Sequence, residues 1–194
     1  MEIHRGVESF SEQMGQRRKS KTTRVNISDS QVKLIPALVP ASLWGRSVYN
    51  ALRQTGRRKE WETLRLKILE GSANKCHYCA TYYERHMVCH EVWEYADDKR
   101  IATLTTLVIA CRNCNFVLHM GKASLIAEKY GTTEQMDKQI LKQLRTVNRI
   151  SKKEAEYLIE EAAMLFVIRS PRKWRVRIAS DLIRQHPVLS GLKL

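Results

Sequence analysis

The chain has 194 residues, with 34 Lys and Arg against 20 Asp and Glu, a formal net charge of +14 at pH 7. This length suits one domain with an appendage better than two full domains, and a 43% hydrophobic content is enough to bury a core. The charge favours a polyanionic partner, nucleic acid first, with a merely solvated basic surface as the alternative. The absence of an apolar run of about 18 residues argues against a membrane span, and no secretory leader is visible, so a cytoplasmic protein of bacterial or phage type is expected.

Residues 1–40 are predicted to form a basic, flexible arm. The run 16–24 has no apolar period, and it offers five candidate nucleic-acid contacts: Arg17, Arg18, Lys19, Lys21 and Arg24. A solvated tail that binds nothing is an equally open interpretation. Pro36 and Pro40 flank a short apolar stretch that is expected to be extended.

Residues 41–71 are predicted to be helical. One helix begins after Pro40 and ends near Gly56. A second helix over 58–70 has an apolar face that includes Trp61 and Leu64, and Gly71 follows it.

Residues 72–123 contain two identically spaced cysteine pairs. Cys76 and Cys79 form the first pair, and Cys111 and Cys114 repeat the same spacing. Two such knuckles can converge on one tetrahedral zinc ion, so a structural zinc bound by reduced thiolates is predicted. Buried free thiols are the alternative. The odd fifth cysteine, Cys89, argues against a secreted disulfide framework.

The segment between the pairs is predicted to contain an extended stretch over 87–95, a turn at 97–100 and an apolar stretch over 104–110. A helix is expected to start at the second pair, to carry both Asn115 and His119 on one face, and to end at Gly121.

Residues 124–194 are predicted to be mainly helical packing elements. The signals are a helix after Thr133, a capping box at 151–154 ahead of another helix that ends before Pro171, and a short strand over 174–178. The expected fold class is therefore α+β, with a central zinc-stabilised domain flanked by helical segments.

Three residues of the cysteine-bearing region, 72–123, have the chemistry of phosphodiester hydrolysis. His90, on the expected strand, could accept a proton from water. Asn115 and His119 could hold a divalent ion through an amide oxygen and an imidazole nitrogen, and such an ion stabilises the charge that develops on phosphate. A structural or DNA-contacting role for His90 and helix capping by Asn115 are the alternatives. Arg112 is a candidate phosphate contact.

The stretch from Cys76 to Gly121 resembles the HNH endonuclease family, in the subgroup where two CxxC pairs bind a structural zinc beside a ββα-metal site. The resemblance covers about 50 residues, 72–123, and includes the runs 89–95 and 118–121. It implies that His90 is the general base and that Asn115 and His119 ligate a catalytic magnesium or other divalent ion. It also implies that the four paired cysteines hold zinc, and that DNA is the substrate, with RNA as a second possibility.

Two positions depart from the family pattern. Cys89 stands where the family often has an Asp or His metal ligand, so it is a possible ligand, although a thiolate suits zinc better than magnesium. Thr106 replaces an Asn that usually holds the loop bearing the base. Two non-catalytic alternatives are therefore kept: a zinc module that binds nucleic acid or serves as a subunit of a larger nucleic-acid-processing or defence complex, and a protein-interaction scaffold.

Overall fold

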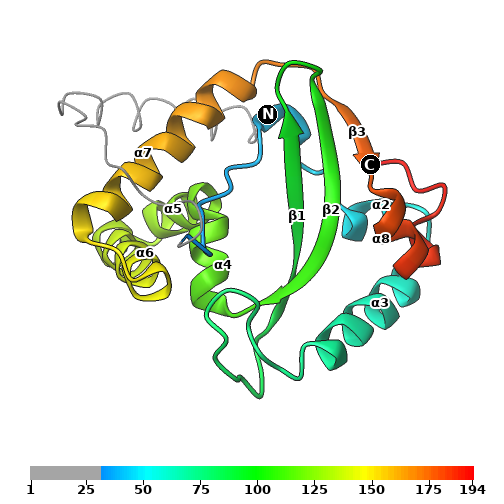
Figure 1. The fold of residues 1–194 in the computed structure, drawn as a ribbon, viewed down its shortest axis with the longest axis horizontal. Coiled ribbons are helices and arrows are strands. Elements are labelled where there is room, and N and C mark those ends of the chain that lie inside the picture. The colour runs from blue at the N-terminus through cyan, green and yellow to red at the C-terminus, as the bar shows by residue number, and fades with distance from the viewer. Residues whose placement is uncertain (1–31) are drawn as a thin grey trace. The chain divides into compact units, whose positions relative to one another are not determined.

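The computed structural model describes residues 32–194, which form an α+β fold (Figure 1). This confirms the predicted class. The described chain contains, in order, η3 (Ala41–Leu43), α2 (Val48–Gln54), α3 (Arg58–Gly71), β1 (Val88–Ala96), β2 (Ile101–Ala110), α4 (Arg112–Leu118), α5 (Met120–Lys129), α6 (Thr133–Asn148), α7 (Lys152–Arg169), β3 (Arg175–Ile178), α8 (Ser180–Gln185) and η4 (Pro187–Leu189). None of the helices in this range is long and apolar enough to cross a membrane.

The described residues divide into two compact units, each built from two stretches of chain. We call residues 42–112 with 171–194 the sheet unit, and residues 32–41 with 113–170 the helical unit. The segment boundaries expected from the sequence, at residues 40, 71 and 123, stay a prediction. Arg17, Arg18, Lys19, Lys21 and Arg24 lie outside the described residues.

The sheet has three strands in the order β1-β2-β3, with β1 and β2 antiparallel and β3 parallel to β2 (Figure 1). Thr105 forms a bulge on β2, because Val92 pairs with Thr106 while the next residue, Trp93, pairs with Leu104. The Thr105 hydroxyl donates to the Val92 carbonyl at 3.2 Å. Since the extra residue belongs to β2, the side chains of β1 keep their regular alternation across the two faces of the sheet.

One face of the sheet carries the core of the sheet unit. Leu104 and Leu107 of β2 pack there with residues of α2, α3, α8 and η4, and Cys89 and Trp93 of β1 pack against the same cluster. The expected apolar face of α3 is confirmed, since Trp61 and Leu64 are buried in this cluster. Helix α8 follows the predicted short strand and was not anticipated from the sequence.

The helical unit contains α5, α6 and α7, and an extended segment beginning at residue 32 packs within it. The predicted capping box is confirmed, since Ser151 Oγ accepts from the Glu154 N–H at 3.2 Å while the Glu154 carboxylate accepts from the Ser151 N–H at 2.7 Å. These bonds satisfy two N–H groups that the start of α7 would otherwise leave unpaired.

The helix after the second cysteine pair is shorter than predicted. Helix α4 ends at Leu118, and His119 is the N-cap of α5, which contains Gly121. The prediction that one helix carries both Asn115 and His119 and ends at Gly121 is therefore wrong. The Asn115 carbonyl still accepts the His119 N–H at 3.0 Å, so the chain keeps a helical turn up to the break between α4 and α5.

Candidate metal centre

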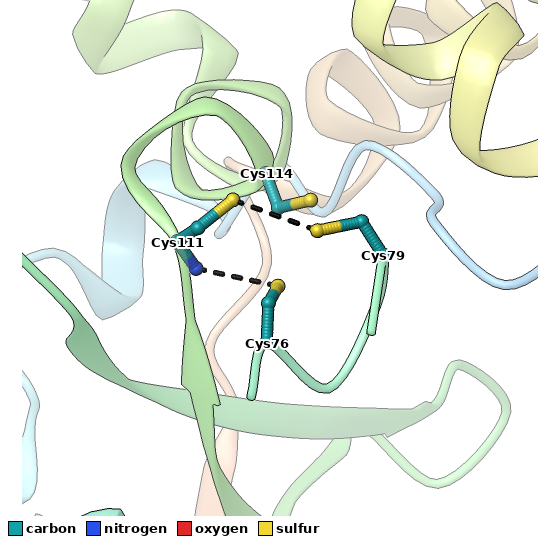
Figure 2. Close-up of side chains that lie close together, drawn as sticks. All are labelled: Cys76, Cys79, Cys111 and Cys114. Atoms are coloured by element: carbon teal, nitrogen blue, oxygen red, sulfur yellow. Dashed lines mark hydrogen bonds between the residues drawn. The ribbon is translucent and has the colours of Figure 1, made fainter. Parts of the chain in front are cut away.

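The four paired cysteines come together. The sulfur atoms of Cys76, Cys79, Cys111 and Cys114 all lie within 4.8 Å of one another (Figure 2). The Cys79 and Cys111 sulfurs are 3.8 Å apart, close to the roughly 3.8 Å edge of a tetrahedron with Zn–S bonds of about 2.3 Å. Within residues 32–194 this is the only group of three or more Cys, His, Asp or Glu side chains so arranged. The donor set and spacing suggest a structural zinc site, as predicted.

The first pair sits in a tight knuckle. The Ala80 N–H donates to the Cys76 carbonyl at 2.9 Å, and the Cys76 N–H donates to the Thr81 carbonyl at 3.0 Å. Ala80 has a φ of 57°, in the left-handed region that a reversal of this kind requires. The His77 N–H donates to the Ile109 carbonyl at 2.8 Å, which ties the knuckle to the end of β2.

The second pair follows directly from β2. Cys111 comes immediately after the strand, and Cys114 lies in the first turn of α4, so the strand-to-helix transition brings both sulfurs to the same place (Figure 2). Cys76, Cys111 and Cys114 are buried, and Cys79 is partly exposed. A site closed off from solvent in this way is typical of structural zinc.

Two N–H groups donate to the sulfurs. The Cys111 N–H points to Cys76 Sγ at 3.3 Å (Figure 2), and the Gln143 side-chain amide of α6 points to Cys114 Sγ at 3.2 Å. Donors of this kind stabilise the thiolate form and orient the ligand. Gln143 was not anticipated, since it lies 29 residues from Cys114 and nothing in its local sequence marks it.

His90 lies on β1 beside the first knuckle. Its side chain is 5% exposed, and it pairs with Val108 of β2. The ring of Tyr78, which lies between Cys76 and Cys79 in the chain, meets the His90 ring edge-on with centroids 6.2 Å apart. The knuckle therefore helps to fix the position of the His90 imidazole within the sheet unit.

Asn115 and His119 belong to the helical unit. Asn115 Oδ1 is the one buried side-chain polar atom in residues 32–194 that has no hydrogen-bond partner. Such an atom normally finds a donor or a cation, because leaving it unpaired costs about 1–3 kcal/mol. Burial, with a smaller effect from the Lys122 charge, lowers the pKa of His119 to about 4, so its imidazole is neutral at pH 7 and able to ligate a metal.

The two positions that depart from the family pattern have clear places in the fold. Cys89 lies on the opposite face of β1 from His90 and packs against the core of the sheet unit. Burial, with a smaller contribution from the Glu91 charge, raises the pKa of Cys89 to about 12, so it is a neutral thiol at pH 7. It is outside the four-cysteine group. Thr106 pairs with Val92 next to the bulge, and Arg112 is exposed at the first residue of α4.

Glu91 follows His90 on β1 and points to the opposite face of the sheet. It lies on the core face of β1, and its carboxylate accepts from the Val48 N–H at the start of α2 at 2.8 Å. Burial raises the pKa of Glu91 to about 7, against the opposing effect of hydrogen bonds from Val48 and Trp93. Because strand residues alternate, the sequence predicts that Glu91 and His90 point to opposite faces of the sheet. It does not predict that the start of α2 packs over the Glu91 carboxyl.

Comparison with protein-family models, curated proteins and solved structures gives no match to this chain.

Proposed function

We propose that the protein is a metal-dependent endonuclease of the HNH type that hydrolyses DNA phosphodiester bonds. The observation that carries this proposal is the pair formed by Asn115 Oδ1, buried without a donor, and His119, held neutral by burial four residues later. Both follow immediately after the four-cysteine cluster. An amide oxygen is a ligand that suits magnesium or manganese, and a neutral imidazole is a ligand of divalent transition-metal ions.

Three residues have proposed roles in the reaction. His90 acts as general base, since a neutral imidazole nitrogen accepts a proton from the attacking water. Tyr78 and the knuckle hold the His90 ring in place. Asn115 and His119 would hold the divalent ion, whose charge would stabilise the negative charge on the phosphate. The cysteine cluster supplies rigidity and takes no part in the chemistry.

Plasmid cleavage tests the proposal. Zinc-loaded protein is incubated with supercoiled plasmid and magnesium or manganese, and conversion to nicked and linear DNA is followed on a gel. His90→Ala should lower the rate by at least a hundredfold, in line with loss of a general base. His77→Ala is the matched control, because His77 is an exposed histidine next to a cysteine ligand. No cleavage by the wild type, or equal cleavage by the two variants, contradicts the proposal.

A second measurement examines the metal ligands without relying on cleavage. Manganese binding, followed by electron paramagnetic resonance, should weaken at least tenfold in Asn115→Ala. Asn113→Ala is the control, since Asn113 is exposed on the same helix. Unchanged manganese affinity in Asn115→Ala removes the basis for a catalytic metal at this position.

One observation favours a second function, a non-catalytic zinc module that binds nucleic acid. Only 5% of the His90 side chain is exposed, whereas a general base has to reach water. This alternative predicts salt-sensitive DNA binding that is unchanged in His90→Ala, together with no cleavage in any divalent metal.

A further inference from the structure

Strand β3 alternates between basic and apolar side chains. Lys173, just before the strand, and Arg175 and Arg177 within it are exposed, while Trp174 is buried and Val176 is half-buried. Trp174 also meets Tyr95 of β1 edge-on, with ring centroids 5.2 Å apart. The apolar side of this short segment therefore fixes it on the sheet unit, and its basic side faces solvent.

The register of the sheet places these arginines on a defined face. Arg177 pairs with Thr103 of β2, and Thr103 pairs with Glu94 of β1. Paired residues share a face, and alternate residues of β1 share a face, so Glu94 and Arg177 lie on the face that carries His90. With about 3.4 Å per residue along a strand and about 4.8 Å between strands, Arg177 lies roughly 17 Å from His90 across the sheet.

The basic side chains of this strand are not neutralised locally. Within residues 32–194, Lys173, Arg175 and Arg177 make no ion pair, whereas the neighbouring Arg172 is held by Asp97 at 2.8 Å. Two further exposed basic residues, Lys99 and Arg100, lie in the β1–β2 turn, where the Arg100 carbonyl accepts from the Arg175 N–H at 2.9 Å. Two exposed acidic residues lie nearby, Glu94 on the same face and Asp98 in the β1–β2 turn.

We propose that Lys173, Arg175 and Arg177 form a basic edge that contacts the phosphate backbone of DNA. Exposed, unpaired cations along one strand edge match the charge of a phosphate backbone, and such contacts position a duplex without reading its sequence. The distance from Arg177 to His90 corresponds to about five base pairs at 3.4 Å each. The choice of DNA as the partner rests on the proposed function, and binding is measured separately from cleavage.

Charged residues on an edge strand also have a simpler use, since they block pairing with an edge strand of a second molecule. This role predicts that neutralising the three residues increases self-association and leaves DNA affinity unchanged. It supplies the competing outcome of the test.

The test measures affinity for a fluorescein-labelled 20-base-pair duplex by anisotropy at several salt concentrations. The full chain is used, zinc-loaded, in the His90→Ala background and without added magnesium, so cleavage plays no part. The variant K173Q/R175Q/R177Q is compared with R58Q/K59Q/K67Q, which removes the same charge from exposed positions of α3 in the same unit. Size-exclusion chromatography reports self-association.

The basic-edge variant should bind at least tenfold more weakly than the α3 control at 100 mM salt. Each lost phosphate contact should reduce the slope of log K against log salt by about 0.9. Equal affinity and slope in the two variants overturn the proposal, as does self-association without loss of affinity. If the triple variant aggregates, R175Q and R177Q are measured singly. A salt slope that is unchanged in both single variants also overturns the proposal. Because this test measures binding without magnesium, a negative result overturns the basic edge alone. The endonuclease proposal is tested separately by plasmid cleavage.

Discussion

The side chain of Asn148 bonds both backbone groups of Leu34. Asn148 Oδ1 accepts from the Leu34 N–H at 2.9 Å, and Asn148 Nδ2 donates to the Leu34 carbonyl at 2.7 Å. The same oxygen also accepts from the Lys33 N–H at 2.9 Å. The side-chain amide of Asn148, the last residue of α6, thus forms the hydrogen bonds that a neighbouring strand would form with residues 33–34. We call this set of bonds the Asn148 clamp. It holds an extended segment that is more than 110 residues away in the chain.

Asn148→Ala should release this segment. Leu34 is fully buried and Asn148 is 4% exposed, so the truncation leaves buried backbone groups unsatisfied at about 1–3 kcal/mol each. Amide hydrogen exchange at residues 33–34 should accelerate at least tenfold, as measured by mass spectrometry of the peptide that contains them. Gln135→Ala, at an exposed position of the same helix, is the control. Identical exchange rates in the two variants would mean that the Asn148 hydrogen bonds contribute little to holding residues 33–34 in place.

The cysteine cluster and Cys89 should respond differently to the same substitution. Cys79→Ser should lower the bound zinc from about one ion per chain, because a tetrahedral structural site needs all four ligands. Cys89→Ser should retain the full zinc content, since Cys89 packs on the core and its raised pKa keeps it a thiol. Elemental analysis of the purified variants measures this directly. Zinc loss in Cys89→Ser would return Cys89 to the ligand set.

The cysteine spacing was sufficient to predict the metal cluster because the ligands within each pair are local. Each knuckle is a short turn, so two CxxC pairs fix most of the geometry once the strand β2 joins them. The clamp at Asn148 and the donor at Gln143 could not be predicted, because each depends on tertiary packing between distant residues. The predicted helix end was placed at Gly121, because glycine is the local signal for a helix end. The observed break lies at His119, between Leu118 and Met120, and both of these residues are buried.

Glu91 should make stability depend on pH. The folded state raises its pKa from 4.5 to about 7, so the proton is held more tightly in the folded chain than in the unfolded one. The resulting stability is complete below about pH 4.5 and is lost as the pH rises through about 7. Glu91→Gln stays neutral and keeps an oxygen for the Val48 N–H. The difference in unfolding free energy between Glu91→Gln and the wild type should therefore grow with pH, by at most about 3.5 kcal/mol at 1.36 kcal/mol per pKa unit.

Urea unfolding of the zinc-loaded proteins between pH 5.5 and 8 measures this difference. Glu94→Gln is the matched control, because Glu94 is exposed on the opposite face of the same strand. If the unfolding free energies of the wild type and Glu91→Gln change with pH in parallel across this range, the pKa of Glu91 is not raised by folding and the prediction is wrong.

Gln143 should tune zinc affinity. Its amide donates to Cys114 Sγ at 3.2 Å, whereas Gln139, one turn earlier on α6, donates to the Asn113 side chain at 2.9 Å. Removing an outer partner of a metal ligand typically costs 10–100-fold in metal affinity. Gln143→Leu should therefore bind zinc about tenfold more weakly, as measured by competition with a chromophoric chelator. Gln139→Leu removes a comparable bond from the same helix to a residue that is not a ligand, so its zinc affinity should stay near that of the wild type. An equal loss of zinc affinity in both variants would mean that the effect comes from the packing of α6 and not from the hydrogen bond to Cys114 Sγ.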